Sequence, residues 1–138
     1  MAISRNQSHF VIMTVIYDEL ADFVMGGGAS SRNANELIEE IAETPFDEVD
    51  PYIKRSVALT MQHYGEIVDA FRPMLVNWKW ERIPLLTQAI LLMSYAHFYY
   101  VEKVDKKVVI NTAVDLAKKY VEEKQAKFIN AILDGVLQ

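Results

Sequence analysis

The sequence contains no cysteine, which excludes disulfide bonds, thiolate metal sites and a cysteine nucleophile. Glycine and proline are scarce, with 5 and 4 residues, so the composition of the 138-residue chain is that of a folded protein rather than a disordered one. The three histidines, His9, His63 and His97, are too far apart for the spacing of metal ligands. We therefore expect no metal ion and no cofactor.

Long hydrophobic runs are also missing. A membrane-spanning helix needs roughly 18 apolar residues, and the longest candidate, Leu85–Tyr100, is interrupted by Thr87, Gln88, Ser94 and His97. The N-terminus lacks the basic-then-apolar pattern of a secretion signal. These features predict a cytoplasmic protein that does not contact a membrane.

Positive charge is scarce in the first half of the chain. Residues 1–70 carry 4 Lys and Arg against 12 Asp and Glu, a balance of −8, whereas residues 71–138 carry 10 against 7, a balance of +3. The overall charge of −5 disfavours strong non-specific binding to nucleic acid, which depends on neutralised phosphates. These numbers are compatible with a local basic face in the second half of the chain. They are equally compatible with two ordinary solvated surfaces that have no binding role.

Helical periodicity and capping residues predict an all-α protein of about six or seven helices, forming one domain over residues 1–138. Five of the expected helices have a predicted start, four of them at a capping residue. These starts are Ser4 with Gln7, Asn33 with Glu36, Asp50 with Pro51, Asp105, and a last start near 122–124. Gly26–Ser31 is expected to be a loop, and Gly65 to break a helix. The segment Leu85–Tyr100 is apolar nearly all round, which is typical of a buried central helix.

Signals for catalysis are weak. The pairs Glu39–Glu40 and Glu122–Glu123 lie on polar helix faces, and Gly26–Gly28 follows a helix and lacks the Lys and Ser/Thr of a phosphate-binding loop. His63 is most simply part of a helix-surface or helix-end cluster, and His97 a core histidine with satisfied hydrogen bonds. We expect no catalytic residue and a protein that is not an enzyme.

Signals for binding are stronger in the last third of the chain. Lys118, Lys119, Lys124 and Lys127 are clustered, with Phe128 beside them. An exposed aromatic ring next to cations is typical of single-stranded nucleic-acid binding, because the ring stacks on a base while the cations contact phosphates. An aromatic residue at helical spacing is more often part of the core, so Phe128 remains open to both interpretations.

Five groups of residues carry a family resemblance: Asn111–Lys118 and Lys127–Asp134 near the C-terminus, Asn77 with Trp78, Glu81–Ile83 with Ala89–Leu91, and Tyr17 with Tyr52. With them the chain resembles the NusB transcription antitermination family, whose C-terminal signature corresponds to the first two groups. The resemblance implies an all-α NusB-like fold of two packed helical subdomains, and a protein without enzymatic activity. It also implies that the protein binds the boxA element of ribosomal RNA leaders together with the ribosomal protein NusE. This RNA–protein assembly joins an RNA polymerase antitermination complex and suppresses premature Rho-dependent termination.

The resemblance assigns RNA-binding roles to six residues. They are Arg5 and His9 in the N-terminal segment, the aromatic residues Tyr17 and Phe128, and the lysines Lys118 and Lys127. The chain departs from the family where several arginines are usual, since Ser4–His9 holds a single arginine.

Three alternatives stay open. The protein binds RNA and NusE, or it is a protein-interaction module that has lost most RNA binding. As a distant third, it is related to the NusB-like domain of an RNA cytosine methyltransferase, although 138 residues leave no room for that catalytic domain. The aromatic segment Tyr95–Tyr100 is compatible with a homodimer or with a buried helix.

Overall fold

The computed structural model describes residues 3–26 and 33–138, and within these ranges the protein is all-α, as predicted. Seven α-helices are present there: α1 (Arg5–Met25), α2 (Ala34–Ala42), α3 (Pro51–Gln62), α4 (Tyr64–Phe71), α5 (Leu85–Ala96), α6 (Lys106–Tyr120) and α7 (Glu123–Val136). Three short 3₁₀ turns, Phe46–Glu48, Arg72–Met74 and Trp80–Arg82, lie between them. Most of the predicted glycine loop, residues 27–31, lies outside the described residues.

Four of the helices begin at the predicted caps. Ser4 and Gln7 form a reciprocal capping box at α1, with Gln7 N donating to Ser4 Oγ at 3.2 Å. Asn33, Asp50 and Asp105 each accept a hydrogen bond from a backbone N–H two residues ahead, at α2, α3 and α6. Because each cap depends on residues close together in sequence, these helix starts were predictable.

Two predicted boundaries differ from the structure. The helix is interrupted at His63, between α3 and α4, rather than at Gly65. Gly65 lies inside the first turn of α4. The predicted helix ending near Tyr100 instead stops at Ala96 and continues as a π turn, His97–Val101. Arg55 of α3 stabilises this turn, since its guanidinium donates to the carbonyl oxygens of Tyr100 and Val101 at 3.3 and 3.1 Å.

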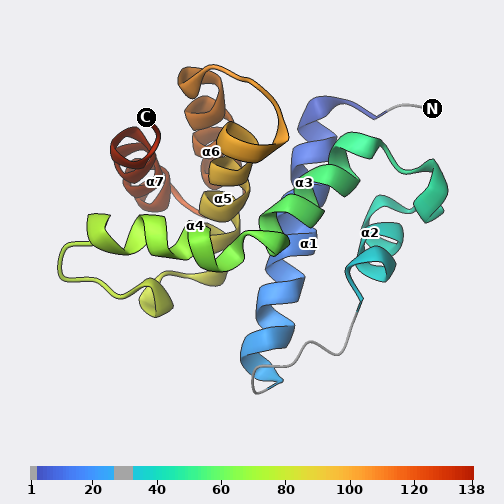
Figure 1. Cartoon of the computed structure of the whole chain (residues 1–138), viewed down its shortest axis with the longest axis horizontal. Helices are drawn as coiled ribbons and strands as arrows, with labels where there is room; N and C mark the ends of the chain where they lie inside the picture. The colour runs from blue at the N-terminus through green and yellow to red at the C-terminus, as the bar shows by residue number, and fades with distance from the viewer. Residues whose placement is uncertain (1–2, 27–32) are drawn as a thin grey trace.

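The helices form two groups, α1–α3 and α4–α7, which meet where α1 packs against α5 (Figure 1). Helix α1 also packs against α2 and α3, and α5 also contacts α4, α6 and α7. This arrangement matches the two packed subdomains implied by the family resemblance. As predicted, α5 is buried nearly all round, with Ala89–Leu92 fully inside. Each such leucine or isoleucine stabilises the fold by about 1.5–3 kcal/mol.

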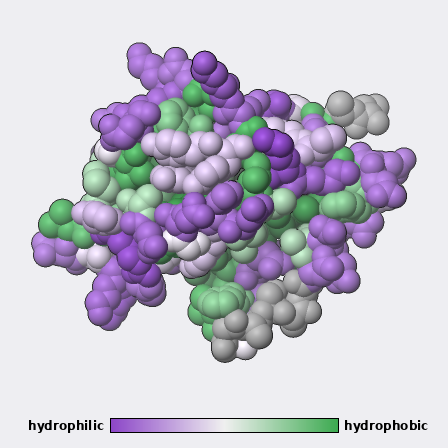
Figure 2. All heavy atoms as spheres, viewed as in Figure 1, coloured by the Kyte–Doolittle hydropathy of each residue, from purple (hydrophilic) through white to green (hydrophobic). Residues whose placement is uncertain are grey.

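The surface shown in Figure 2 is mostly hydrophilic, with hydrophobic side chains gathered near the end of α1. The large hydrophobic residues exposed at that end are Phe23, Val24 and Met25. In the described part of the chain, no helix is both long and apolar enough to cross a membrane.

Candidate nucleic-acid interface

The first turn of α1 carries Arg5, one of the six predicted site residues. Its guanidinium lies 3.6 Å from the ring centroid of Tyr52 in α3, a cation–π contact. Its Nη1 also donates to Oε2 of Glu102 at 3.0 Å. The capping box therefore fixes the start of α1 so that Arg5 reaches α3 and the residue following the π turn. Arg5 is exposed but already paired within the molecule.

His9 lies one turn further along α1 and points into the protein. The residue is 8% exposed, and its Nε2 lies 3.0 Å from the Tyr52 hydroxyl. Burial lowers the pKa of His9 to about 4, and the neighbouring charges of His97 and Arg5 act in the same direction. His9 is therefore neutral near pH 7 and offers hydrogen bonding rather than charge.

Glu102 joins these residues to His97. The Glu102 carboxylate lies 2.7 Å from His97 Nε2 through the same oxygen that accepts from Arg5. Although burial alone raises the pKa of Glu102, its hydrogen bonds to His97 and Arg5 outweigh that effect and lower the pKa overall. We call Arg5, His9, Tyr52, His97 and Glu102 the Arg5 cluster. His97 is a partly satisfied core histidine, in line with the prediction.

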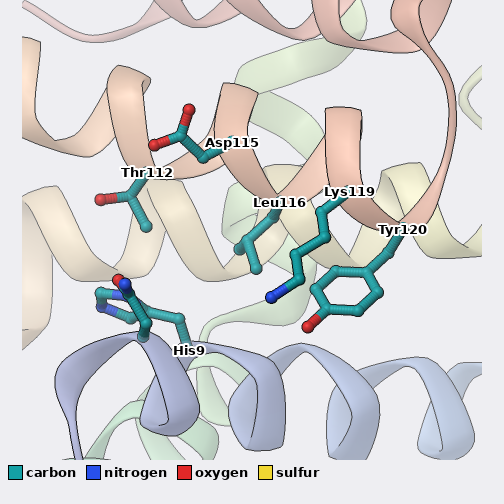
Figure 3. A pocket seen from close by; sticks show the side chains of 7 residues that line it. His9, Thr112, Asp115, Leu116, Lys119 and Tyr120 are labelled. Carbon is teal, nitrogen blue, oxygen red and sulfur yellow. The ribbon is translucent and has the colours of Figure 1, made fainter.

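A shallow groove of about 130 Å³ runs between α1 and α6, beside the Arg5 cluster (Figure 3). Lys119 extends its amine into this groove, whereas Asp115 points away from α1. At one end, the rings of Phe10 and Tyr120 pack with centroids 5.1 Å apart, and Lys119 Nζ lies 5.4 Å from the Tyr120 centroid. The groove is lined by Asn6, His9, Thr112, Asp115, Leu116, Lys119 and Tyr120.

Sequence reasoning missed the two rings and placed Lys119 only in a general lysine cluster. Phe10 belongs to the apolar pattern of α1, and Tyr120 ends α6, so no local signal connects them. The one available signal was the position of Tyr120 directly after two lysines. The groove combines a cation with aromatic rings, a combination that suits a base and its phosphate.

The other predicted residues lie on separate parts of the surface. Tyr17 is 36% exposed on α1, about 12 Å along the helix from His9 at 1.5 Å per residue. Lys118 is exposed in the last turn of α6, and Lys127 is exposed in α7. Lys118 and Lys119 lie in the last turn of α6, near the negative end of the helix dipole.

Phe128 lies in a second groove, away from the Arg5 cluster. It is half-buried against the core and lines an apolar groove beside Trp78, which is 60% exposed. In Figure 1, α7 and the start of α1 lie on opposite sides of α5 and α6. The structure therefore does not bring Phe128 together with Arg5 and His9. Phe128 is therefore partly a core residue, and its RNA-binding role stays a prediction.

The residues considered for catalysis have structural contacts. Glu39 accepts a hydrogen bond from the backbone N–H of Phe46 at 2.8 Å, and His63 stacks on Tyr100 with centroids 3.9 Å apart. Within residues 3–26 and 33–138, no three His, Cys, Asp or Glu side chains gather in a group that could hold a metal ion.

The fold and the grooves define an all-helical binding protein. Comparison with protein families identifies it further: the chain belongs to the NusB family, whose model matches residues 12–138. The resemblance seen in the sequence is thereby confirmed, and with it the expectation of a non-enzymatic transcription antitermination protein. Arg5 and His9 lie before the matched residues.

Curated relatives and solved structures agree with this assignment. The transcription antitermination protein NusB of Bacillus subtilis is 30% identical over 102 residues, covering 74% of this chain and 76% of the relative. The NusB of Clostridium botulinum is 34% identical over 97 residues, covering 70% and 73%.

Two solved structures share the fold. T. maritima NusB matches with a TM-score of 0.80 at 20% identity, covering 99% of this chain and 92% of that one. Antitermination factors NusB and NusE in complex with double-stranded RNA match with a TM-score of 0.77 at 23% identity, covering 96% and 95%.

Proposed function

We propose that this protein acts in the cytoplasm as an antitermination factor that binds a boxA-like single-stranded RNA together with NusE. The assembly then joins RNA polymerase and suppresses premature Rho-dependent termination. The groove between α1 and α6 carries the proposal, because it places the Lys119 amine beside the packed rings of Phe10 and Tyr120. The membership in the NusB family supports it.

The groove favours unpaired RNA. Side chains stack on bases only where the bases are splayed out of a duplex, and lysines nearby neutralise the phosphates. Lys118 in the same helix and Lys127 on the neighbouring α7 are further exposed cations. The known complex of NusB and NusE holds double-stranded RNA, so a comparison of the two RNA forms is part of the test.

A second candidate is a protein-interaction module with little RNA binding. The pairing of Arg5 with Glu102 and the neutral, buried ring of His9 favour this candidate, since both reduce the charge offered by the start of α1. A homodimer through Tyr95–Tyr100 has less support. Within this fully described segment, Tyr99 is exposed and its neighbours pack wholly or partly inside.

Titration of a labelled boxA-like RNA, with and without NusE and at two salt concentrations, tests the proposal. We expect Lys119→Gln to weaken RNA binding and to reduce the slope of log affinity against log salt by about 0.7, the value for one phosphate contact in a single strand. Lys106→Gln is the matched control, because Lys106 lies in the same helix and pairs with Asp134 at 3.3 Å.

The control variant should bind RNA as the wild type does. Absence of RNA binding in both mixtures would rule out the RNA-binding proposal. Binding to NusE without RNA would establish the protein-interaction module instead. Tighter binding to the duplex than to the single strand would contradict the stacking role of the groove.

A further inference from the structure

The guanidinium of Arg5 is held between an aromatic ring and a carboxylate from distant parts of the chain. Tyr52 lies under it at 3.6 Å, and Glu102, which is 97 positions away in the sequence, accepts from Nη1 at 3.0 Å. A carboxylate and a phosphate are the two anions that a guanidinium binds best, through the same planar N–H donors. Glu102 therefore occupies the position in which an RNA phosphate would contact Arg5.

The carboxylate is fixed in place independently of Arg5. His97, 9% exposed, holds the same Oε2 at 2.7 Å. The preceding π turn is anchored by Arg55, which donates to the carbonyl oxygens of Tyr100 and Val101. Glu102 thus keeps His97 as a polar partner when Arg5 moves to a phosphate. The Glu102 carboxylate is therefore not left without a hydrogen-bond partner. Tyr52 can keep the guanidinium oriented during the same exchange.

The pair is exposed enough to be displaced. The side chains of Arg5 and Glu102 are 57% and 38% exposed, and ion pairs of this kind are weak in water. A phosphate and the Glu102 carboxylate cannot both lie against one guanidinium without repelling each other. A phosphate that contacts Arg5 at this end of α1 therefore competes with Glu102 for the guanidinium.

The geometry points to Glu102 as an internal competitor of RNA: its carboxylate binds Arg5 in the free protein, and an RNA phosphate replaces it in the complex. This inference rests on the proposed RNA-binding function and adds a residue that lowers the affinity. The start of α1 then offers little positive charge to RNA for two reasons: it carries a single arginine, and Glu102 pairs with that arginine.

A double-mutant cycle with the full chain, NusE and a labelled boxA-like RNA tests this inference. We expect Glu102→Gln to tighten RNA binding about two- to fivefold, the equilibrium equivalent of one exposed ion pair. In the Arg5→Gln background, the same Glu102→Gln change should alter the affinity less than twofold, because the competition has already been removed. Glu81→Gln is the matched control, since Glu81 pairs with Arg72 at 2.7 Å.

Each outcome separates the two proposals. If the wild type binds RNA and Glu102→Gln does not tighten the binding, the competitor role is wrong while the RNA-binding function stands. Equal tightening in both backgrounds, or by Glu81→Gln, would show general charge repulsion and also overturn it. Binding by Glu102→Gln but not by the wild type would support the competitor role strongly. If neither binds, both proposals fail. Circular dichroism checks that each variant keeps its helical fold.

Discussion

His9 links the stability of the protein to pH through a single buried ring. Its pKa of about 4 in the folded state lies below the value of 6.5 expected for an unfolded chain, chiefly because burial disfavours its charged form. Between these two values the unfolded chain binds more protons than the folded one. The free energy of unfolding therefore falls as the pH drops from 6.5 to 4.

We predict that His9 accounts for a loss of up to about 3 kcal/mol of unfolding free energy over this pH range. His9→Gln keeps a polar side chain near Tyr52 but removes the titration, so it should flatten the pH dependence. Urea unfolding at several pH values between 7 and 4 measures both slopes. Parallel slopes for the wild type and the variant would contradict the prediction.

Features of the site could be predicted only where they depend on residues close together in the sequence. The clustering of Lys118 with Lys119 and the helix start that carries Arg5 followed from neighbouring residues in the sequence. The partner of Arg5 did not, because Glu102 is distant in sequence and reaches Arg5 only after α1 and α5 have packed together. The position of Phe128 beside Trp78 likewise depends on the contact between α7 and the loop after α4.

At the scale of helices, the capping box of α1 connects stability with binding. Ser4 and Gln7 hold the first turn, which carries Arg5 and the groove residue Asn6. Asn33 caps α2 in a similar way but lines neither groove.

We predict that Ser4→Ala and Asn33→Ala each lower the free energy of unfolding by about 1 kcal/mol, the usual cost of losing an N-cap. Ser4→Ala should also weaken RNA binding, because its first turn frays, whereas Asn33→Ala should leave RNA binding unchanged. Chemical denaturation and RNA titration of the same samples measure both effects. Equal RNA affinities for the two variants would show that the cap does not position Arg5.

The helix starts were predictable from neighbouring residues, but the π turn was not. Ser4, Asp50 and Asp105 act on backbone groups within three residues, so their effect is visible in the sequence. The change from α5 to the π turn coincides with side chains from other elements, with Arg55 donating to its carbonyls and His63 stacking on Tyr100. Such contacts exist only once α3 has packed against this segment.

At the scale of the whole molecule, α5 connects the two groups of helices. It contacts α1 and α3 in one group and α4, α6 and α7 in the other. Its composition alone predicted a central position, since a helix that is apolar all round has no face suited to water.

We predict that the chain unfolds as one cooperative unit and that Leu92→Ala lowers its free energy of unfolding by about 2–5 kcal/mol, through lost burial and the resulting cavity. Leu92 is completely buried in α5, so both groups should lose stability together. The control Val108→Ala, at a half-exposed position in α6, should change stability by less than about 0.5 kcal/mol.

Circular dichroism, which reports all helices, and fluorescence, which includes the buried Trp80, should give coincident unfolding curves. Two separated transitions would show that the groups of helices unfold independently and that α5 does not couple them.

The π turn has a consequence for the length of the chain. Its last hydrogen bond runs from the Glu102 N–H to the His97 carbonyl at 3.5 Å, so this segment holds one more residue than an α-helical turn closed over the same span. Deletion of one residue here would let the α-helix continue and would rotate the following side chain by about 100° around the axis. The sequence from Lys106 onward could remain intact, yet Glu102 would face away from Arg5. The number of residues in this one turn therefore determines whether the Glu102 carboxylate can neutralise the charge of Arg5 at the start of α1.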